Sequence, residues 1–131
     1  MTDNSWGHIY WEMIHTLGYN SITLQNVNGF ISLIKEIVNR MPCEKCIKHA
    51  NKYIKKHNNI DMTKRLPDGK YLGPFIWTCE FHNYVNNELG KNTISWIITK
   101  KKYDDRFNDC PGGCIDDGTN KNVTVRIIKK K

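Results

Sequence analysis

Residues 74–91 read PFIWTCEFHNYVNNELGK, and two patterns overlap in this stretch. Apolar side chains recur at helical spacing between Phe75 and Leu89, with Pro74 suited to a first helical turn and Gly90 to a C-terminal cap. A second stripe of the same helix is polar and consists of Cys79, His82, Asn83 and Asn86. A solvated face would carry lysine and glutamate instead, whereas buried amides and imidazoles require hydrogen-bonding partners. The stretch therefore predicts a helix whose polar stripe meets a planar, acceptor-rich heterocycle.

Helical spacing extends through most of the chain outside this stretch. Apolar periodicity and capping residues predict further helices over residues 5–18, 30–38, 43–54 and 94–102. Pro42 suits the first turn of the helix that follows it, because proline fits where the amide would be unpaired anyway. A polar link is predicted over residues 20–28 and a loop over residues 58–73. The fold class is therefore all-α, arranged as a small helical bundle with an irregular C-terminal tail.

The length, the apolar content and the number of cysteines narrow the class of protein. A length of 131 residues fits one domain that buries a core without needing disulfides. No stretch is apolar enough to span a membrane, and the polar N-terminus lacks a secretory leader, so a cytoplasmic protein is expected. Five cysteines in that compartment favour metal binding or redox chemistry over static disulfides.

The net charge of +7 raises the question of a nucleic-acid partner. Lysines account for most of the excess and are scattered over several helix-like segments, and no recognised nucleic-acid-binding motif is present. A solvated basic surface explains this distribution more simply. No nucleic-acid partner is therefore expected.

Cys43 and Cys46 form a Cys-x-x-Cys pair at the start of a predicted helix. This position favours a thiolate, because the unpaired amides and the dipole at a helix N-terminus stabilise negative charge. The pair alone is compatible with a zinc site, a structural disulfide or a redox-active dithiol. Zinc would need two more ligands, which Cys110 and Cys114 could supply.

The first predicted helix places Gly7, Trp11, His15 and Tyr19 four residues apart, so that they share one stripe. Core packing accounts for Trp11. It accounts less well for a glycine, which lowers helix stability, or for an imidazole beside a tryptophan. The stripe is therefore predicted to contact a planar ligand.

Three motifs follow one another along the chain: WGHIYWEMIH (6–15), PCEKC (42–46) and WTCEFHNYVNNELGK (77–91). Their ordered combination resembles the Erv/ALR family of FAD-linked sulfhydryl oxidases, in particular the compact versions encoded by large DNA viruses. The resemblance implies a cone-shaped four-helix bundle with a short fifth helix, which holds FAD at its mouth and is usually a homodimer. Residues 1–102 would form this oxidase domain, and residues 103–131 a tail without a clear family counterpart.

The resemblance also implies a role for individual residues. Cys46 would face the flavin and attack its C4a region, while Cys43 would exchange with the incoming thiol. The cofactor contacts carried over by position are Gly7, Trp11, His15, Tyr19, His82, Asn83, Val85, Asn86 and Lys91. In the family, the tyrosine that follows the histidine of the first helix usually lies one residue beyond the position of Tyr19. The resemblance implies no metal.

The chain departs from the family at its other cysteines. Many members pair the cysteine that matches Cys79 with a later one, but Trp96 stands at that later position, so Cys79 is expected to be a buried thiol. Cys110 and Cys114 are separated by Pro-Gly-Gly and could close a local disulfide. Such a pair either shuttles electrons from substrates to the Cys-x-x-Cys pair or clips the tail.

The residues and the resemblance together predict an FAD-dependent thiol oxidase that makes disulfides in protein substrates and passes the electrons to O2, giving H2O2. Viral relatives imply a place in the host cytoplasm or the virion. The first alternative is a zinc-binding interaction module that uses Cys43, Cys46, Cys110 and Cys114, which leaves both stripes unexplained. The second is a flavin-free exchanger of the thioredoxin type, which would need a βαβ pattern that the sequence lacks.

Overall fold

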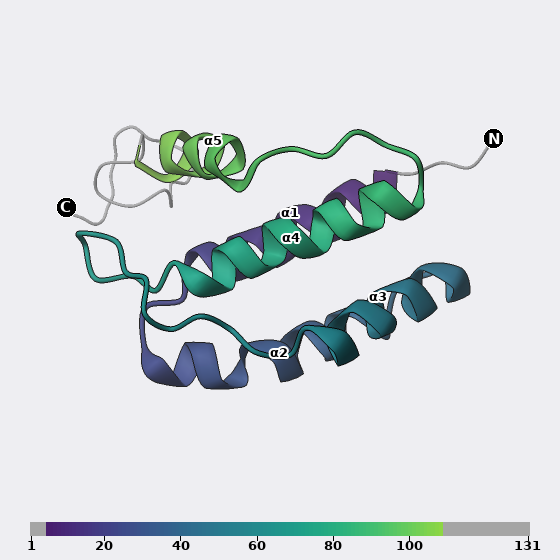
Figure 1. The fold of residues 1–131 in the computed structure, drawn as a ribbon, viewed down its shortest axis with the longest axis horizontal. Coiled ribbons are helices and arrows are strands. Elements are labelled where there is room, and N and C mark those ends of the chain that lie inside the picture. Colours follow the sequence, from purple (N-terminus) through teal and green to yellow (C-terminus); the bar gives the residue numbers. More distant parts are fainter. Residues whose placement is uncertain (1–4, 109–131) are drawn as a thin grey trace, which may run out of the picture. The chain divides into compact units, whose positions relative to one another are not determined.

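The computed structural model describes residues 5–108, most of which are helical (Figure 1). The helices are α1 (Ser5–Tyr19), α2 (Leu24–Val38), α3 (Glu44–Lys56), α4 (Gly73–Glu88) and α5 (Trp96–Asn108). Over the described range there is no strand, only an isolated bridge between Arg65 and Tyr71 in the loop before α4. The all-α prediction is confirmed. None of these helices is long and apolar enough to cross a lipid bilayer.

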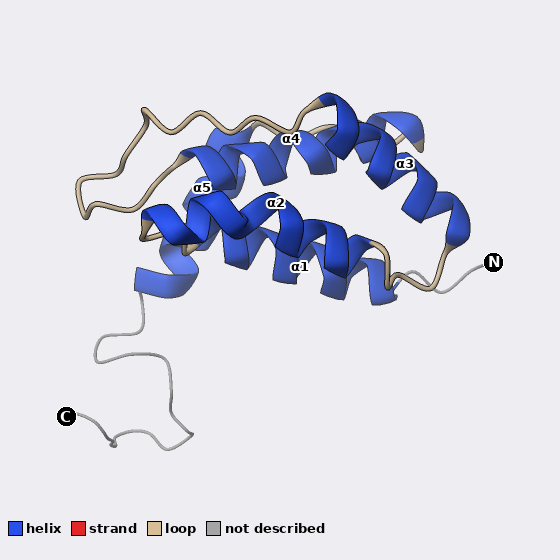
Figure 2. Cartoon of the chain, turned by 90° about the horizontal axis from the view of Figure 1, so that it is seen from below, coloured by secondary structure: helices blue, strands red, loops and turns tan. Residues whose placement is uncertain are grey.

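The chain divides into two compact units, residues 1–96 and residues 97–131, and the first holds α1 to α4. Each of these four helices packs on the next, and α4 packs back on α1 with the most extensive contact (Figures 1 and 2). A Cβ on Gly18 would lie only 2.9 Å from the Thr78 methyl and 3.0 Å from the Pro74 carbonyl oxygen. The close crossing of α1 and α4 therefore requires a glycine at this position.

Side chains from all four helices form one hydrophobic core. Its buried members are Ile14, Phe30, Ile34, Val38, Ala50, Tyr53, Ile54, Trp77 and Phe81. The ring of Tyr53 stacks on Phe81 at 5.0 Å between centroids, and the Trp77 indole donates a hydrogen bond of 2.6 Å to the His57 carbonyl. Burial, together with the carboxylate of Glu80, raises the pKa of Tyr53 to about 12, so this core phenol stays protonated.

Helix α2 begins at Leu24, inside the segment predicted as a polar link, so that prediction is wrong. The Thr23 hydroxyl accepts from the Asn26 amide at 3.1 Å, and the Asn26 side chain accepts from the Thr23 amide at 3.0 Å. This reciprocal capping box starts the helix. In the first turn and a half that follows, Val27 is the only buried side chain. The apolar period was therefore too weak at this end to reveal it.

Several other boundaries differ from the prediction, among them the end of α3 at Lys56 and the start of α5 at Trp96, and the end of α4 agrees with it. Pro42 precedes α3 instead of lying in its first turn, because Cys43 is the extended N-cap residue. Helix α5 continues to Asn108, six residues beyond its predicted end. Ion pairs at i, i+4 support the extra turns, namely Lys100 with Asp104 at 2.6 Å and Lys101 with Asp105 at 3.3 Å. The predicted end of α4 is correct, with Gly90 at φ 72° just after its C-cap.

Candidate active site

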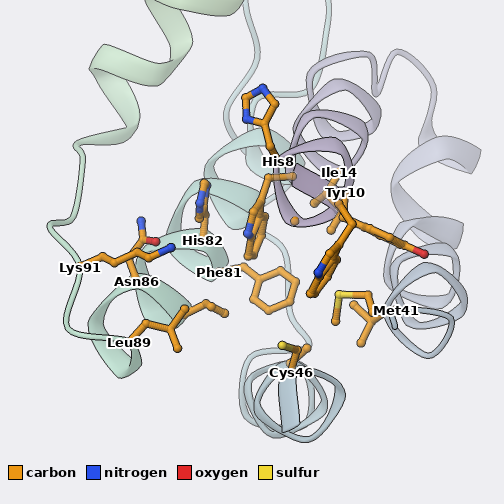
Figure 3. A pocket seen from close by; sticks show the side chains of 16 residues that line it. His8, Tyr10, Ile14, Met41, Cys46, Phe81, His82, Asn86, Leu89 and Lys91 are labelled. Atoms are coloured by element: carbon orange, nitrogen blue, oxygen red, sulfur yellow. The ribbon is translucent and has the colours of Figure 1, made fainter. Parts of the chain in front are cut away.

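The described residues enclose a cavity of about 300 Å³ at one end of the α1–α4 bundle (Figure 3). Neighbouring helices alternate in direction, so the start of α1, the end of α2, the start of α3 and the end of α4 meet there. The residues that line it are Trp6, Gly7, His8, Tyr10, Trp11, Ile14, Val38, Met41, Cys46, Ala50, Phe81, His82, Val85, Asn86, Leu89 and Lys91. The lining is mostly apolar and aromatic, with its polar groups concentrated on α4 and just beyond it.

A disulfide joins Cys43 and Cys46 at the N-terminus of α3. The backbone amide of Cys46 donates to the Cys43 sulfur at 3.2 Å, so Cys43 caps the helix through its own Sγ. Both cysteines are partly exposed, but only Cys46 lines the cavity, into which its side chain points from α3 (Figure 3). A thiolate formed at Cys43 on reduction would keep this amide hydrogen bond and the favourable helix dipole. The two sulfurs therefore have different environments, because Cys46 lines the cavity and Cys43 does not.

Helices α1 and α4 supply the aromatic wall of the cavity. Trp11 stacks on His82 with 4.0 Å between ring centroids and 9° between planes, and it meets the edge of Phe81 at 5.1 Å. Gly7 lies one turn before Trp11, and a Cβ at this position would meet no atom within 4 Å. Because Gly7 also lines the cavity, the missing side chain leaves cavity space open.

A chain of hydrogen bonds supports His82 from behind. His82 Nδ1 lies 3.0 Å from His15 Nε2, and His15 Nδ1 lies 2.8 Å from the Thr78 hydroxyl oxygen. The Thr78 hydroxyl donates in turn to the Phe75 carbonyl at 2.7 Å. His15 is buried and does not line the cavity. It contacts His82, which does.

Two other predicted residues also lie outside the cavity lining. Asn83 exchanges two hydrogen bonds with the backbone of Ile94, at 2.7 and 2.9 Å, and so fixes the segment after α4. Tyr19 is buried against Phe75 with 5.6 Å between ring centroids, and the Lys70 ammonium lies 4.4 Å from the centre of its ring. Of the nine cofactor contacts implied by the resemblance, the cavity thus brings together Gly7, Trp11, His82, Val85, Asn86 and Lys91.

Several residues that line the cavity were not predicted from the sequence. Trp6 and Tyr10 are one helical turn apart and meet edge to face at 5.8 Å, and the Tyr10 hydroxyl donates to the Arg40 carbonyl at 3.0 Å. Their i, i+4 spacing was a usable signal. Met41 lies beyond the end of α2, where periodicity gives no indication of direction, and Leu89, part of the predicted apolar pattern, is the C-cap residue of α4.

The other cysteines bear on the zinc alternative. Cys79 is buried, as expected. Cys110 and Cys114 lie outside the described residues, so their pairing and role stay a prediction. Within the described range no group of three or more histidine, cysteine, aspartate or glutamate side chains could hold a metal ion.

Comparison with known proteins gives the same family as the motifs. The model of the Erv1/Alr family matches residues 8–108. The chain belongs to the Erv1/Alr family. An FAD-linked sulfhydryl oxidase from a warthog isolate of African swine fever virus is 32% identical over 109 residues, covering 76% of this chain and 80% of the viral protein. The corresponding protein of a tick isolate is 30% identical over the same length, and a protein of invertebrate iridescent virus 6 is 29% identical over 112 residues, covering 79% of this chain and 98% of its own.

Proposed function

We propose that this chain is an FAD-dependent thiol oxidase that forms disulfides in protein substrates. One observation carries the proposal: Cys46, half of the Cys43–Cys46 disulfide, lines the same cavity as the aromatic and polar residues of α1 and α4. The relatives named FAD-linked sulfhydryl oxidases, and the family match over residues 8–108, support it.

The residues of the cavity fit FAD. Trp11 and Phe81 provide apolar ring surfaces for a planar heterocycle, and Asn86 and Lys91 provide a hydrogen-bonding and a cationic group at one edge. The open space beside Gly7 would otherwise be filled by a side chain. We therefore assign cofactor binding to Gly7, Trp11, His82, Val85, Asn86 and Lys91. His15 and Asn83 would act indirectly, by holding His82 and the segment after α4.

The cysteine pair would carry out thiol–disulfide exchange. A substrate thiolate attacks Cys43 Sγ, forms a mixed disulfide and releases Cys46 as a thiolate in the cavity. A second substrate thiolate breaks the mixed disulfide, so the substrate leaves oxidised and the pair is left as a dithiol. FAD, when bound, would supply the two-electron acceptor for this dithiol, with O2 as the final acceptor. The balance is two thiols and one O2 giving one disulfide and one H2O2.

The likeness to viral proteins supports the remaining parts of the proposal. We propose protein thiols as the substrates and, because the relatives are viral, the host cytoplasm or the virion as the place of action. The homodimer implied by the family resemblance is part of the same proposal. A dedicated oxidase would serve in the host cytoplasm because cytoplasmic thiols otherwise stay reduced.

The proposal is tested by measuring flavin content and turnover separately in the wild-type chain and in two variants. The purified full chain should show a flavin spectrum and should form one H2O2 per disulfide from a small dithiol. Cys46→Ser should keep the flavin and lose at least about 1,000-fold in turnover, because the thiolate that faces the cavity is removed. Cys79→Ala, the matched control, should keep both. A colourless protein, or a Cys46→Ser variant that still turns over, would refute the proposal.

A further inference from the structure

Helix α3 carries a strip of lysines on the face opposite the core. Lys45, Lys48, Lys52, Lys55 and Lys56 are all exposed, and we call them the lysine strip. At 3.6 residues per turn these positions fall within an arc of about 100° and extend over about 16 Å of the helix. The buried residues of α3, Ala50, Tyr53 and Ile54, lie on the other side. The strip is therefore one continuous basic surface.

Within residues 5–108, no side chain neutralises the charge of the lysine strip. None of its five members forms an ion pair or a side-chain hydrogen bond with another described residue. The lysines of α5 provide the contrast, since Lys100 and Lys101 each pair with an aspartate four residues on. Glu44 is the only acidic residue of α3. The field of the strip is thus available to a partner.

The strip begins at the redox disulfide. Lys45 lies between Cys43 and Cys46 in the sequence, and the other four lysines follow along α3 away from the disulfide. Cys43, the sulfur outside the cavity, is partly exposed. A substrate thiol that reaches Cys43 would bring the chain around it to the N-terminal end of α3, where the strip begins.

We propose that the lysine strip docks acidic segments that flank the oxidisable cysteines of substrate proteins. This inference rests on the proposed thiol oxidase function and adds a substrate class to it. Complementary charge raises the rate of encounter and fixes the direction of approach, while a basic segment is repelled. A nucleic acid is less well matched, because α3 has no exposed tryptophan, tyrosine or phenylalanine on which bases could stack, its Tyr53 being buried.

The test uses the flavin-loaded full chain and three substrates: a small uncharged dithiol, and two peptides with the same cysteine pair flanked by either Asp and Glu or Lys. The acidic peptide should have the higher kcat/KM at low salt, and the difference should disappear at high salt. Lys52→Glu should lower the ratio of kcat/KM for the acidic peptide to that for the small dithiol by about three- to tenfold. Lys35→Glu is the matched control, because this exposed lysine of α2 lies outside the strip and gives the same change in net charge. Its ratio should stay at the wild-type value.

Each contrary outcome has a distinct meaning. Equal kcat/KM for the two peptides, or the same fall in the ratio for Lys35→Glu, would overturn the docking role. Binding of a single-stranded DNA oligonucleotide that is lost in Lys52→Glu, without a difference between the peptides, would assign the strip to nucleic acid and also overturn it. Failure of the wild-type protein to oxidise the small dithiol would instead refute the proposed function itself.

Discussion

The two sides of the cavity differ in composition. The side formed by α2 and α3 presents Val38, Met41, Ala50 and one sulfur of the disulfide, whereas the side formed by α1 and α4 presents stacked rings and polar groups. Only the first side carries a group that can change its oxidation state. Only the second carries the ring surfaces, amide and ammonium that a nucleotide requires. Under the proposed function, electron transfer would take place on the first side and cofactor binding on the second, so substitutions should affect the two separately.

The largest effect on binding is expected at His82. His82→Ala removes the ring that stacks on Trp11 and ends the hydrogen-bond chain from Thr78. FAD should bind about 10- to 100-fold more weakly, because the stacking and the part-buried hydrogen bond that hold His82 in the wall each contribute on the order of 1 kcal/mol. The melting temperature in the presence of FAD should fall with the affinity, since a ligand that binds only the native state stabilises it by mass action. Titration of the flavin-free variant with FAD measures the affinity, and thermal unfolding in the presence of FAD measures the melting temperature.

Cys46→Ser is the comparison on the opposite side of the cavity, and it should leave FAD affinity near the wild-type value. The separation would be contradicted if Cys46→Ser released FAD as readily as His82→Ala. It would also be contradicted if His82→Ala lowered turnover at saturating FAD as far as Cys46→Ser does.

A smaller effect, of opposite sign on stability and on binding, is expected at Gly7. Gly7→Ala should stabilise the flavin-free protein by up to about 1 kcal/mol, because alanine favours the helix. The same methyl group enters cavity space, so FAD affinity should fall by about tenfold, as overpacking costs on the order of 1 kcal/mol or more. Thermal unfolding with and without FAD measures both changes.

Gly29→Ala is the matched control for Gly7→Ala. Gly29 is an exposed helical glycine of α2, it lies outside the cavity, and a Cβ there also meets nothing within 4 Å. It should give the gain in stability without the loss of affinity. Unchanged FAD binding in Gly7→Ala would mean that the space beside Gly7 is not used by the cofactor.

Part of the site could be predicted from the sequence because helical periodicity assigns residues to a face. Gly7 with Trp11, and His82 with Asn86, are one turn apart, and each pair lines the cavity as its spacing indicates. Periodicity does not tell which edge of a stripe is covered by a neighbouring helix. His15 continues the stripe of Trp11 toward the interior, where α4 closes over it at Thr78.

The parts that could not be predicted depend on contacts distant in sequence or on weak local signals. Asn83 bonds to Ile94, eleven residues away and beyond the end of its helix, and no pattern in the helix reveals that partner. Met41 lines the cavity from a turn whose direction is set by the packing of α2 on α3. The start of α2 was missed because its cap uses Asn26, whereas the usual capping box has a glutamate or glutamine there.

The smallest effect is expected at Thr78, which acts on the cavity only through His15 and His82. The Thr78 hydroxyl has one hydrogen. Its oxygen lies 2.7 Å from the Phe75 carbonyl oxygen, and at this distance two oxygens repel unless a hydrogen lies between them. That hydrogen is therefore donated to Phe75, so Thr78 accepts from His15 Nδ1–H. His15 Nε2 then accepts from His82 Nδ1–H, which leaves His82 Nε2 without a proton in the neutral ring.

Thr78→Val keeps the shape of the side chain but cannot accept a hydrogen bond. The proton of His15 should then move to Nε2, and that of His82 from Nδ1 to Nε2, so that His82 offers the bound nucleotide a donor instead of an acceptor. The ring ¹⁵N chemical shifts of the flavin-free protein report this change directly, and FAD affinity should fall by only a few-fold, about 1 kcal/mol. Thr78→Ser is the crossed control: it keeps the hydroxyl and loses the methyl that lies close to Gly18. It should lower thermal stability by about 1 kcal/mol without moving either proton. Unchanged histidine shifts in Thr78→Val, or the same shifts in both variants, would show that the chain does not set the state of His82.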